Sequence, residues 1–368
     1  MEEGAVVIRQ TTALTIERIA VPEHPMAADA EPFAAIARIS NAMCRHDTGN
    51  ANFDTTPAEM LPAWQDTTDR LHLGFAARMD GDIVGIGTLQ VPREEGATDV
   101  ELDLIMDPDR WGEGVEDQLL DRLEAEARSL GRSVLQTYTL HRAGSDGTRL
   151  TAPTGFGSVP HDRQTALLLA HGYTLEQIER NSVLDLTGGL ERLERMQAEA
   201  QAFAGDDFRV VAWTMPTPDE FAEGFAYAIS RMSTDVPTAG MEWTEEHWDI
   251  ERVRRREARL TASGLTVSVA CVQHVPSGRI AAYTELVIGA EPAAVTHQWG
   301  TLVLREFRGR RLGTLVKCAN LLRWRSLAPE SPRVSTFNAE ENRPMLDVNE
   351  AMGFVPASVA GGWKKTLG

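Results

Sequence analysis

The stretch VLREFRGRRLG (residues 303–313) decides the fold, because it ends an apolar strand and opens a helix. Small residues stand at Gly309 and Gly313. Backbone N–H groups at a helix start converge on an anion, and the helix dipole favours negative charge there. Gly309 lets the backbone approach a diphosphate, and Arg308, Arg310 and Arg311 add positive charge. The turn alone leaves open whether it binds an anion or is a solvated, arginine-rich helix start.

The sequence around this turn predicts a complete α/β unit. Helices are expected at 218–232 and 244–260, followed by a hairpin at 264–289 that turns at Pro276-Ser277-Gly278, and by a strand at 294–304. A helix (310–328), a strand (333–339), a helix (341–354) and a closing strand (358–367) follow.

The first half of the chain repeats this order. A helix is expected at 31–46, a hairpin at 71–91 that turns at Asp80-Gly81, a strand at 100–108, a helix at 114–131, a strand at 132–140, and a short helix and strand around 163–187. We therefore predict an α/β fold class in which a mixed-sheet unit occurs twice. The expected division is residues 1–187, a helical linker at 188–207, and residues 208–368.

The anion turn resembles that of the GNAT superfamily of acyl-CoA-dependent N-acyltransferases, which reads Arg/Gln-x-x-Gly-x-Gly/Ala. Arg308 matches the first position and Gly313 the last, whereas Arg311 stands in place of the middle glycine. Downstream, the segments 336–342 and 348–354 resemble the family's later strand, asparagine, helix and Leu-Gly-Phe-type turn. The whole chain is similar to a tandem GNAT protein of the mycothiol synthase-like, two-domain arrangement.

This resemblance implies two tandem GNAT folds, with acetyl-CoA or another short acyl-CoA as cosubstrate and with no metal. It implies that the turn and the start of its helix bind the cofactor through Arg308, Gly309, Arg310, Arg311, Leu312, Gly313 and Thr314. The strand before the turn would offer the backbone of Leu302, Val303 and Leu304 to the pantetheine and the thioester oxygen, and Asn338 and Asn342 would complete the cofactor site.

The corresponding turn of the first half departs from the family pattern. In PDRWGEGVE (108–116), Gly114 matches the middle glycine, but Trp111 replaces the basic residue and Glu116 the final small one. Several further carboxylates stand beside them and would repel a diphosphate. We predict that the N-terminal unit does not bind CoA productively.

Acyl transfer to an amine needs a group that takes the ammonium proton, and two residues are candidates. His297 falls where some family members carry a glutamate base, and its ordinary pKa suits neutral operation. The alternative is a strand histidine that only packs. Glu285, inside an apolar strand, either faces the cleft as a base or cation-binding group, or lies on a solvated face.

Further residues are expected near the acceptor or have a purely structural alternative. Many family members carry a tyrosine that acts as general acid, seven residues after the asparagine that corresponds to Asn342. Here that position is Asn349, which cannot supply a proton and so has either a binding role or no role in the reaction. Asp235 and Trp243 could line the acceptor pocket, although solvation and core packing are the alternatives. Cys318 is predicted to be buried packing, and the arginine-rich run 252–259 a solvated helix face.

Charge and composition limit the partners. The net charge is −18, of which residues 1–200 carry most, with 34 acidic and 17 basic side chains, whereas residues 301–368 hold 6 acidic and 11 basic ones. Such a surface disfavours nucleic acid, and no apolar run is long enough to cross a membrane. Three scattered cysteines favour a reducing, cytoplasmic location.

The sequence thus predicts a cytoplasmic N-acetyltransferase that acylates a small-molecule amine by direct attack in a ternary complex. The C-terminal unit would be active and the N-terminal unit degenerate, in a monomer or homodimer. A non-catalytic acyl-CoA-binding or drug-sequestering protein with the same fold is the alternative.

Overall fold

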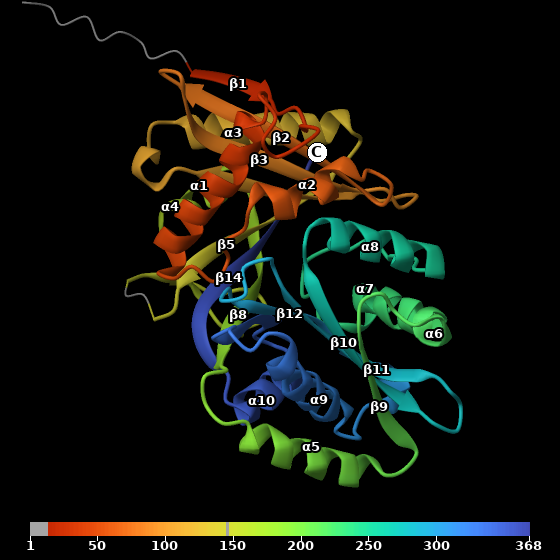
Figure 1. Ribbon diagram of the computed structural model, residues 1–368. Coiled ribbons are helices and arrows are strands. Elements are labelled where there is room, and N and C mark those ends of the chain that lie inside the picture. The colour runs from red at the N-terminus through yellow and green to blue at the C-terminus, as the bar shows by residue number, and fades with distance from the viewer. Residues whose placement is uncertain (1–13, 145–146) are drawn as a thin grey trace, which may run out of the picture.

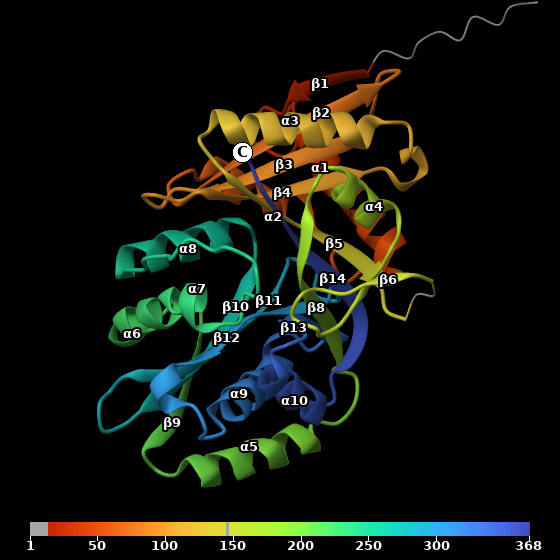
Figure 2. The same cartoon turned by 180° about the vertical axis from the view of Figure 1, so that it is seen from behind.

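The structure is a computed structural model that describes residues 14–144 and 147–368. Twelve strands form one mixed sheet in the order β1-β2-β3-β4-β5-β14-β8-β13-β12-β11-β10-β9, with helices packed against it (Figures 1 and 2). The predicted α/β fold class is therefore confirmed. Within the described residues, no helix combines the length and the apolar character needed to span a bilayer.

The first half of the chain contains β1 (Leu14–Arg18), α1 (Glu31–Thr48), α2 (Pro57–Gln65), β2 (Arg70–Met79), β3 (Asp82–Pro92), β4 (Asp99–Met106), the 3-10 turn η1 (Pro108–Arg110), α3 (Val115–Ser129), β5 (Val134–Arg142), β6 (Arg149–Leu150), β7 (Val159–Pro160), α4 (Arg163–Ala170) and β8 (Thr174–Asp185). The short strands β6 and β7 pair separately from the main sheet.

The second half contains α5 (Glu191–Ala204), β9 (Phe208–Thr214), α6 (Asp219–Ser230), α7 (Met232–Asp235), α8 (Ile250–Ala262), β10 (Thr266–His274), β11 (Ile280–Ile288), β12 (Thr296–Val303), the 3-10 turn η2 (Arg305–Phe307), α9 (Leu312–Leu327), β13 (Arg333–Ala339), α10 (Arg343–Met352) and β14 (Val355–Thr366).

Local sequence signals account for most element boundaries. Asp80 and Gly81 join β2 to β3 with φ values of 55° and 94°, as a type I′ hairpin turn requires. Helix α2, which our sequence analysis missed, begins with a capping box between Thr56 and Glu59. The helix predicted inside the linker is α5, and it packs along α9 at the base of the molecule (Figure 1).

The last strands of the two halves are exchanged, which the sequence analysis did not predict. β14 ends the chain, yet it pairs antiparallel with β5 and β8 of the first half. β8 in turn pairs with β13 of the second half. Trp363 of β14 is fully buried in the first half's core, where its Nε1 donates to Thr139 Oγ1 over 3.0 Å. The sequence repeat thus marks two units, but their strands are shared across its boundary.

Ion pairs across the two units contradict the prediction that the arginine run of α8 is a solvated face. Arg252 contacts Glu94 at 2.7 Å, and Arg255 contacts Asp69 at 2.8 Å. Both acids belong to the first unit, and the side chains of Arg252 and Glu94 are only 11% and 10% exposed. Part of the first unit's excess acid therefore pairs with this helix.

Both units open a wedge in the sheet where two parallel strands diverge. β12 and β13 pair only at Thr296 with Val334 and at His297 with Ser335, and β4 and β5 pair at three positions. On the edge that pairs with β11, β12 carries a bulge, which is seen as a shift in register between Thr284 and Leu286 of β11. The wedge beyond His297 faces the start of α9 and is where the candidate site lies.

Candidate functional site

The anion turn has the predicted geometry of a strand, a tight turn and a helix start. After β12, the turn η2 leads to Gly309 with φ 81°, and α9 begins at Leu312. Arg311, directly before the helix, has φ 56° in the left-handed region, where the family motif has glycine. The first N–H groups of a helix lack intrahelical acceptors, so this turn presents donors to an anion.

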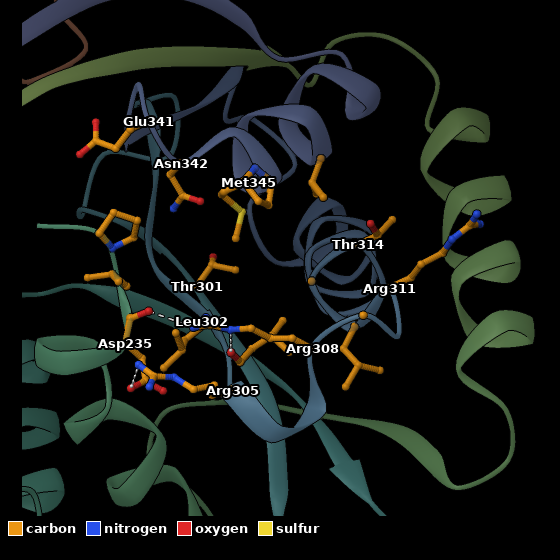
Figure 3. Close-up of a pocket in the computed structure, with 18 of the residues that line it drawn as sticks. Asp235, Thr301, Leu302, Arg305, Arg308, Arg311, Thr314, Glu341, Asn342 and Met345 are labelled. Carbon is orange, nitrogen blue, oxygen red and sulfur yellow. Dashed lines mark hydrogen bonds and ion pairs between the residues drawn. The ribbon is translucent and has the colours of Figure 1, made fainter. Parts of the chain in front are cut away.

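A cavity of about 660 Å³ lies directly on this turn (Figure 3). Its lining comes from η2, the turn, the start of α9, the 234–237 segment and the start of α10, and it includes the predicted residues Leu302, Val303, Arg308, Gly309, Arg311, Leu312, Gly313, Thr314, Asn342 and Asp235. The structure therefore brings most of the predicted cofactor residues together around one hollow.

The arginines of the turn have different surroundings. Arg308 Nε donates to the Val303 carbonyl over 3.1 Å and its Nη2 to the Asp235 carbonyl over 2.9 Å, so it ties the turn to α7. Arg311 lines the cavity, but its guanidinium extends toward α5 and lies over the Phe203 ring at 4.7 Å (Figure 3). Arg310 lies over Phe208 at 5.9 Å and does not line the cavity.

The strand before the turn offers alternate backbone groups to the wedge. The Leu304 N–H donates to the Ala281 carbonyl on β11 over 2.9 Å. Leu302, two residues earlier and opposite Tyr283, has the same orientation, because hydrogen-bonded pairs alternate in an antiparallel ladder. The free backbone edge of β12 is therefore formed by Thr301 and Val303, rather than by all three residues from Leu302 to Leu304.

A second cavity, of about 420 Å³, continues the first one into the wedge. The two share Val236, Pro237, Thr301, Asn342 and Met345. Deeper in, the second cavity is lined by His297, Ser335, Asn338 and, from the first unit, by Phe53 and Glu179. A chain that enters along the anion turn can thus reach a pocket between the two units.

His297 lies at the closed end of the wedge, where β12 and β13 still pair. Burial lowers the pKa of its imidazole, against a smaller opposing effect of the Glu59 carboxylate from the first unit. The ring is therefore neutral at pH 7, which is the form that accepts a proton.

Glu179 is a candidate that the sequence analysis missed. It lies on β8, half-buried, and burial raises the pKa of its carboxyl to about 7, with a further contribution from Glu341. The sequence signal was a glutamate inside the strand TLEQIERNSVLD, but its approach to the second unit's wedge depends on the strand exchange.

Lys317, also missed, opens onto the same cavity from α9. It is only 1% exposed, and its Nζ lies 5.3 Å from the centre of the Phe354 ring. Burial lowers the pKa of this ammonium to about 7. At neutral pH this lysine is thus divided between its charged and neutral forms.

The three predicted asparagines cluster at the α10 side of the wedge. Asn349 is 1% exposed, and its Nδ2 donates to Asn338 Oδ1 over 2.7 Å. Its own Oδ1 has no hydrogen-bond partner among the described residues. Asn342 lines both cavities. Asn349 therefore holds Asn338 in position at the wedge rather than facing the cavity itself.

Glu285 is not in either cavity. Its carboxylate is buried in an ion pair with Arg256, with contacts of 2.7 and 3.0 Å. Arg256 in turn lies 5.6 Å from the ring of Trp299, which lines the second cavity. The geometry gives Glu285 an indirect role, in which it positions a cavity wall through Arg256.

Asp235 and Trp243 lie apart from the wedge. The Asp235 carboxylate contacts Arg231 at 2.6 Å and Arg305 at 3.5 Å on the anion-turn side. Trp243 lines a separate hollow of about 260 Å³ against the first unit. Neither side chain therefore lines the cavity that holds His297.

The turn of the first unit copies the backbone of the second one. Gly112 and Gly309 both have positive φ, at 92° and 81°, and Gly114 and Arg311 follow at 79° and 56°. Helix α3 then begins at Val115, as α9 begins at Leu312. This alignment puts Glu116 at the position of Gly313.

In the first unit a side chain takes the place of an anion. The Gly112 N–H donates to Glu116 Oε1 over 2.9 Å, and Glu116 is only 5% exposed. On the wedge side, Gln136 of β5 exchanges hydrogen bonds with the backbone N–H and carbonyl of Glu242 from the second unit. The first unit's turn thus holds its own carboxylate, and the last paired position of β5 is bonded to the second unit.

A third hollow, of about 820 Å³, connects the second cavity to the surface between the units. It runs between the loop 50–56 of the first unit and strands β11 and β12, and it shares Phe53, His297 and Trp299 with the second cavity. The second cavity therefore adjoins two hollows, one at the anion turn and one between the units. Among the described residues, no cluster of histidine, cysteine, aspartate or glutamate could hold a metal ion.

A tandem GNAT fold is defined by two parallel strands that diverge, by a helix that begins after the first of them, and by a repeat of this unit along the chain. Residues 40–143 match the model of the acetyltransferase (GNAT) family, so the match falls on the first unit. No curated protein matches the chain. The chain is similar to the solved structure of a tandem GNAT protein from the clavulanic acid biosynthesis pathway, with 24% identity and a TM-score of 0.73 over 97% of this chain and 99% of the other.

Two further solved structures share the fold. One is a GCN5-related N-acetyltransferase from Sphaerobacter thermophilus, with 15% identity and a TM-score of 0.57 over 95% of both chains. The other is a glucosamine N-acetyltransferase region of a fungal multi-domain β-N-acetylglucosaminidase, with 14% identity and a TM-score of 0.59 over 96% of this chain and 38% of the other. The prediction of a tandem GNAT fold is confirmed.

Proposed function

We propose that the protein is an acyl-CoA-dependent N-acyltransferase whose second unit transfers a short acyl group, acetyl in the first instance, to the amine of a small molecule. The observation that carries this proposal is the continuity of the two cavities. The first lies on an anion turn, and the second ends at proton-accepting side chains in the wedge.

The acyl-CoA would bind with its diphosphate at the N–H groups of the turn and of the first residues of α9. Its pantetheine would follow the free edge of β12, where Thr301 and Val303 offer backbone groups. The thioester would then lie where the two cavities meet, near Asn342 and Met345. A backbone N–H at that point stabilises the oxygen that becomes negative during attack.

The acceptor amine would enter through the hollow between the two units and attack the thioester directly. His297 is neutral and faces this path, so it is the sequence-predicted group that can accept a proton. Asn349 cannot protonate the leaving thiolate. Lys317 opens onto the same cavity with a pKa of about 7 and can do so.

The test is thiol release from acetyl-CoA in the presence of a panel of small amines, combined with calorimetric titration of acetyl-CoA. Amine-dependent release of CoA supports the proposal. Binding of acetyl-CoA without release by any amine supports the sequestering protein instead, and absence of binding refutes both.

A matched pair of variants ties the activity to the second unit. Gly313→Glu installs, at the equivalent position, the carboxylate that fills the first unit's turn. A Cβ there meets nothing closer than Val303 Cγ2 at 3.5 Å. Repulsion between the new charge and the diphosphate should weaken acetyl-CoA binding at least ~100-fold. Glu116→Gly, the reverse change in the first unit, should leave affinity and turnover within a factor of about two.

A further inference from the structure

Resting on the proposed function, we propose that Glu179, which the first unit contributes to the second unit's cavity, binds the acceptor's ammonium group and accepts its proton. The acceptor class is therefore a primary amine that is cationic at neutral pH. A residue of the first unit would thus act in the reaction of the second unit.

The strand exchange brings Glu179 to the acceptor side of the wedge. Glu179 pairs with Ala339 of β13, and Ser335 of the same strand pairs with His297 of β12. Positions 335, 337 and 339 share one face because side chains alternate along a strand. Glu179 therefore lies on the face that carries His297 and Phe337, opposite the face from which α9 approaches.

The Glu179 carboxylate is free, whereas the polar side chains beside it on β8 are bonded. Gln177 donates to Glu341 Oε1 over 2.7 Å, and Asn181 donates to Ser335 Oγ over 2.8 Å. Arg180 is paired with Glu340 at 2.7 Å. Within the described part of the chain, no hydrogen bond or ion pair reaches Glu179, although it lines the cavity.

The charges around Glu179 come from several elements. Glu341, after β13, raises its pKa, and Glu179 itself raises the pKa values of Glu101 on β4 and Tyr138 on β5. His297 and Lys317 line the same cavity from β12 and α9. Negative groups thus predominate on the β8 side, and an incoming ammonium supplies the missing counter-charge.

The side chains of the cavity wall also indicate what the part of the acceptor next to its ammonium group should be like. Phe53 of the first unit and Phe337 of the second lie 5.5 Å apart at its wall, with their rings tilted by 33°. Both line the 420 Å³ cavity together with Glu179. An amine with a small apolar or aromatic body next to its ammonium group matches this wall, because the rings can contact that body while the carboxylate takes the charge.

The reaction balances with Glu179 as proton acceptor. The ammonium gives one proton to the carboxylate, and the neutral nitrogen attacks the thioester carbon. As the C–N bond forms and the C–S bond breaks, the bonding pair leaves with sulfur. Lys317 protonates the thiolate and is recharged by the second nitrogen proton, so the products are the amide and free CoA, and Glu179 returns its proton to water.

The experiment measures kcat/KM for two amines that share a phenyl ring, phenethylamine, which is cationic at pH 7, and aniline, which is neutral there. Variants are Glu179→Gln, Glu179→Asp and the control Glu176→Gln, a neighbour on β8 that does not line the cavity. We expect Glu179→Gln to lower kcat/KM for phenethylamine at least ~100-fold and for aniline less than about fivefold. Glu179→Asp should retain part of the activity, and acetyl-CoA affinity should stay unchanged in all three.

The outcomes separate this inference from the proposed function. If the wild-type protein releases no CoA with any amine, the proposed function fails. If it does release CoA but Glu179→Gln keeps phenethylamine turnover within threefold, or loses both amines equally, the role of Glu179 is refuted. If kcat/KM rises near pH 7 in the wild type and in the other variants but not in Glu179→Gln, the role of Glu179 is supported.

Discussion

The buried lysine on α9 provides the sharpest test of the electrostatics of this site. Lys317 is 1% exposed, has no ion pair among the described residues, and is one of the three lysines of the chain. Burial lowers its pKa from 10.5 to about 7. A group whose charged form is disfavoured in the folded state destabilises the protein at every pH below its unfolded pKa, and the penalty is full below its folded pKa, where both states hold the proton.

The size of this effect follows from the shift. Each pKa unit is worth about 1.4 kcal/mol, so the lysine lowers the free energy of unfolding by about 5 kcal/mol at pH 6. Stability should recover as the pH rises above 7 toward 10.5, because the folded protein then loses its proton first. At pH 8.5 the remaining penalty is about 3 kcal/mol. Between these two pH values the penalty therefore changes by about 2 kcal/mol.

Lys317→Met keeps an unbranched side chain and removes the charge. We expect the variant to be more stable than the wild type at pH 6, and its advantage to shrink by about 2 kcal/mol at pH 8.5. Urea unfolding followed by tryptophan fluorescence at both pH values measures this. Val316→Ala, a neighbouring fully buried position, is the control and should lose stability by the same amount at both. An advantage of Lys317→Met that does not change with pH, or a loss of stability, would refute the reasoning.

Further predictions follow from the same geometry. Glu285→Gln should cost about 3–5 kcal/mol of unfolding free energy, because it leaves the buried Arg256 without a counter-charge, and the double change Glu285→Leu with Arg256→Met should recover most of it. Loss of activity without loss of stability would instead favour a catalytic Glu285. Arg311→Gly should raise the unfolding free energy by up to ~1 kcal/mol by relieving the positive φ, and change acetyl-CoA affinity less than about threefold in calorimetry; a tenfold loss would contradict this. Calorimetry should find one acetyl-CoA per wild-type chain, and two equal sites would overturn the closed first turn. A chain ending before β14 should lose the near-UV signal of the first unit's core as well, since Trp363 packs there.

Much of the fold could be predicted because its signals are local. The hairpin at Asp80-Gly81 and the anion turn at 303–313 are each specified by a few adjacent residues, and both were confirmed as structures. The residues of the turn that line the first cavity could be named for the same reason. Local patterns also identified the repeat, since each unit carries the same sequence of elements.

The rest could not be predicted because it depends on partners distant in sequence. Glu285 looked like a free carboxylate in a strand, but its partner Arg256 lies 29 residues away on a helix that seemed solvated. Glu179 and β14 belong to strands whose neighbours come from the other unit, and strand propensity does not specify a neighbour. The sequence of the last strand of each unit allows that strand to pair either inside its own unit or with strands of the other unit.

The strand exchange also makes the first unit part of the second unit's cavity. In the first unit's turn the Glu116 carboxylate accepts the Gly112 N–H, and Gln136 of β5 is bonded to Glu242 of the second unit. The first unit supplies β8, which lies between β13 and β14, and through it Glu179. It also supplies Phe53 to the same cavity. Removing the first unit would therefore take away a strand of the sheet and part of the wall of the second unit's cavity.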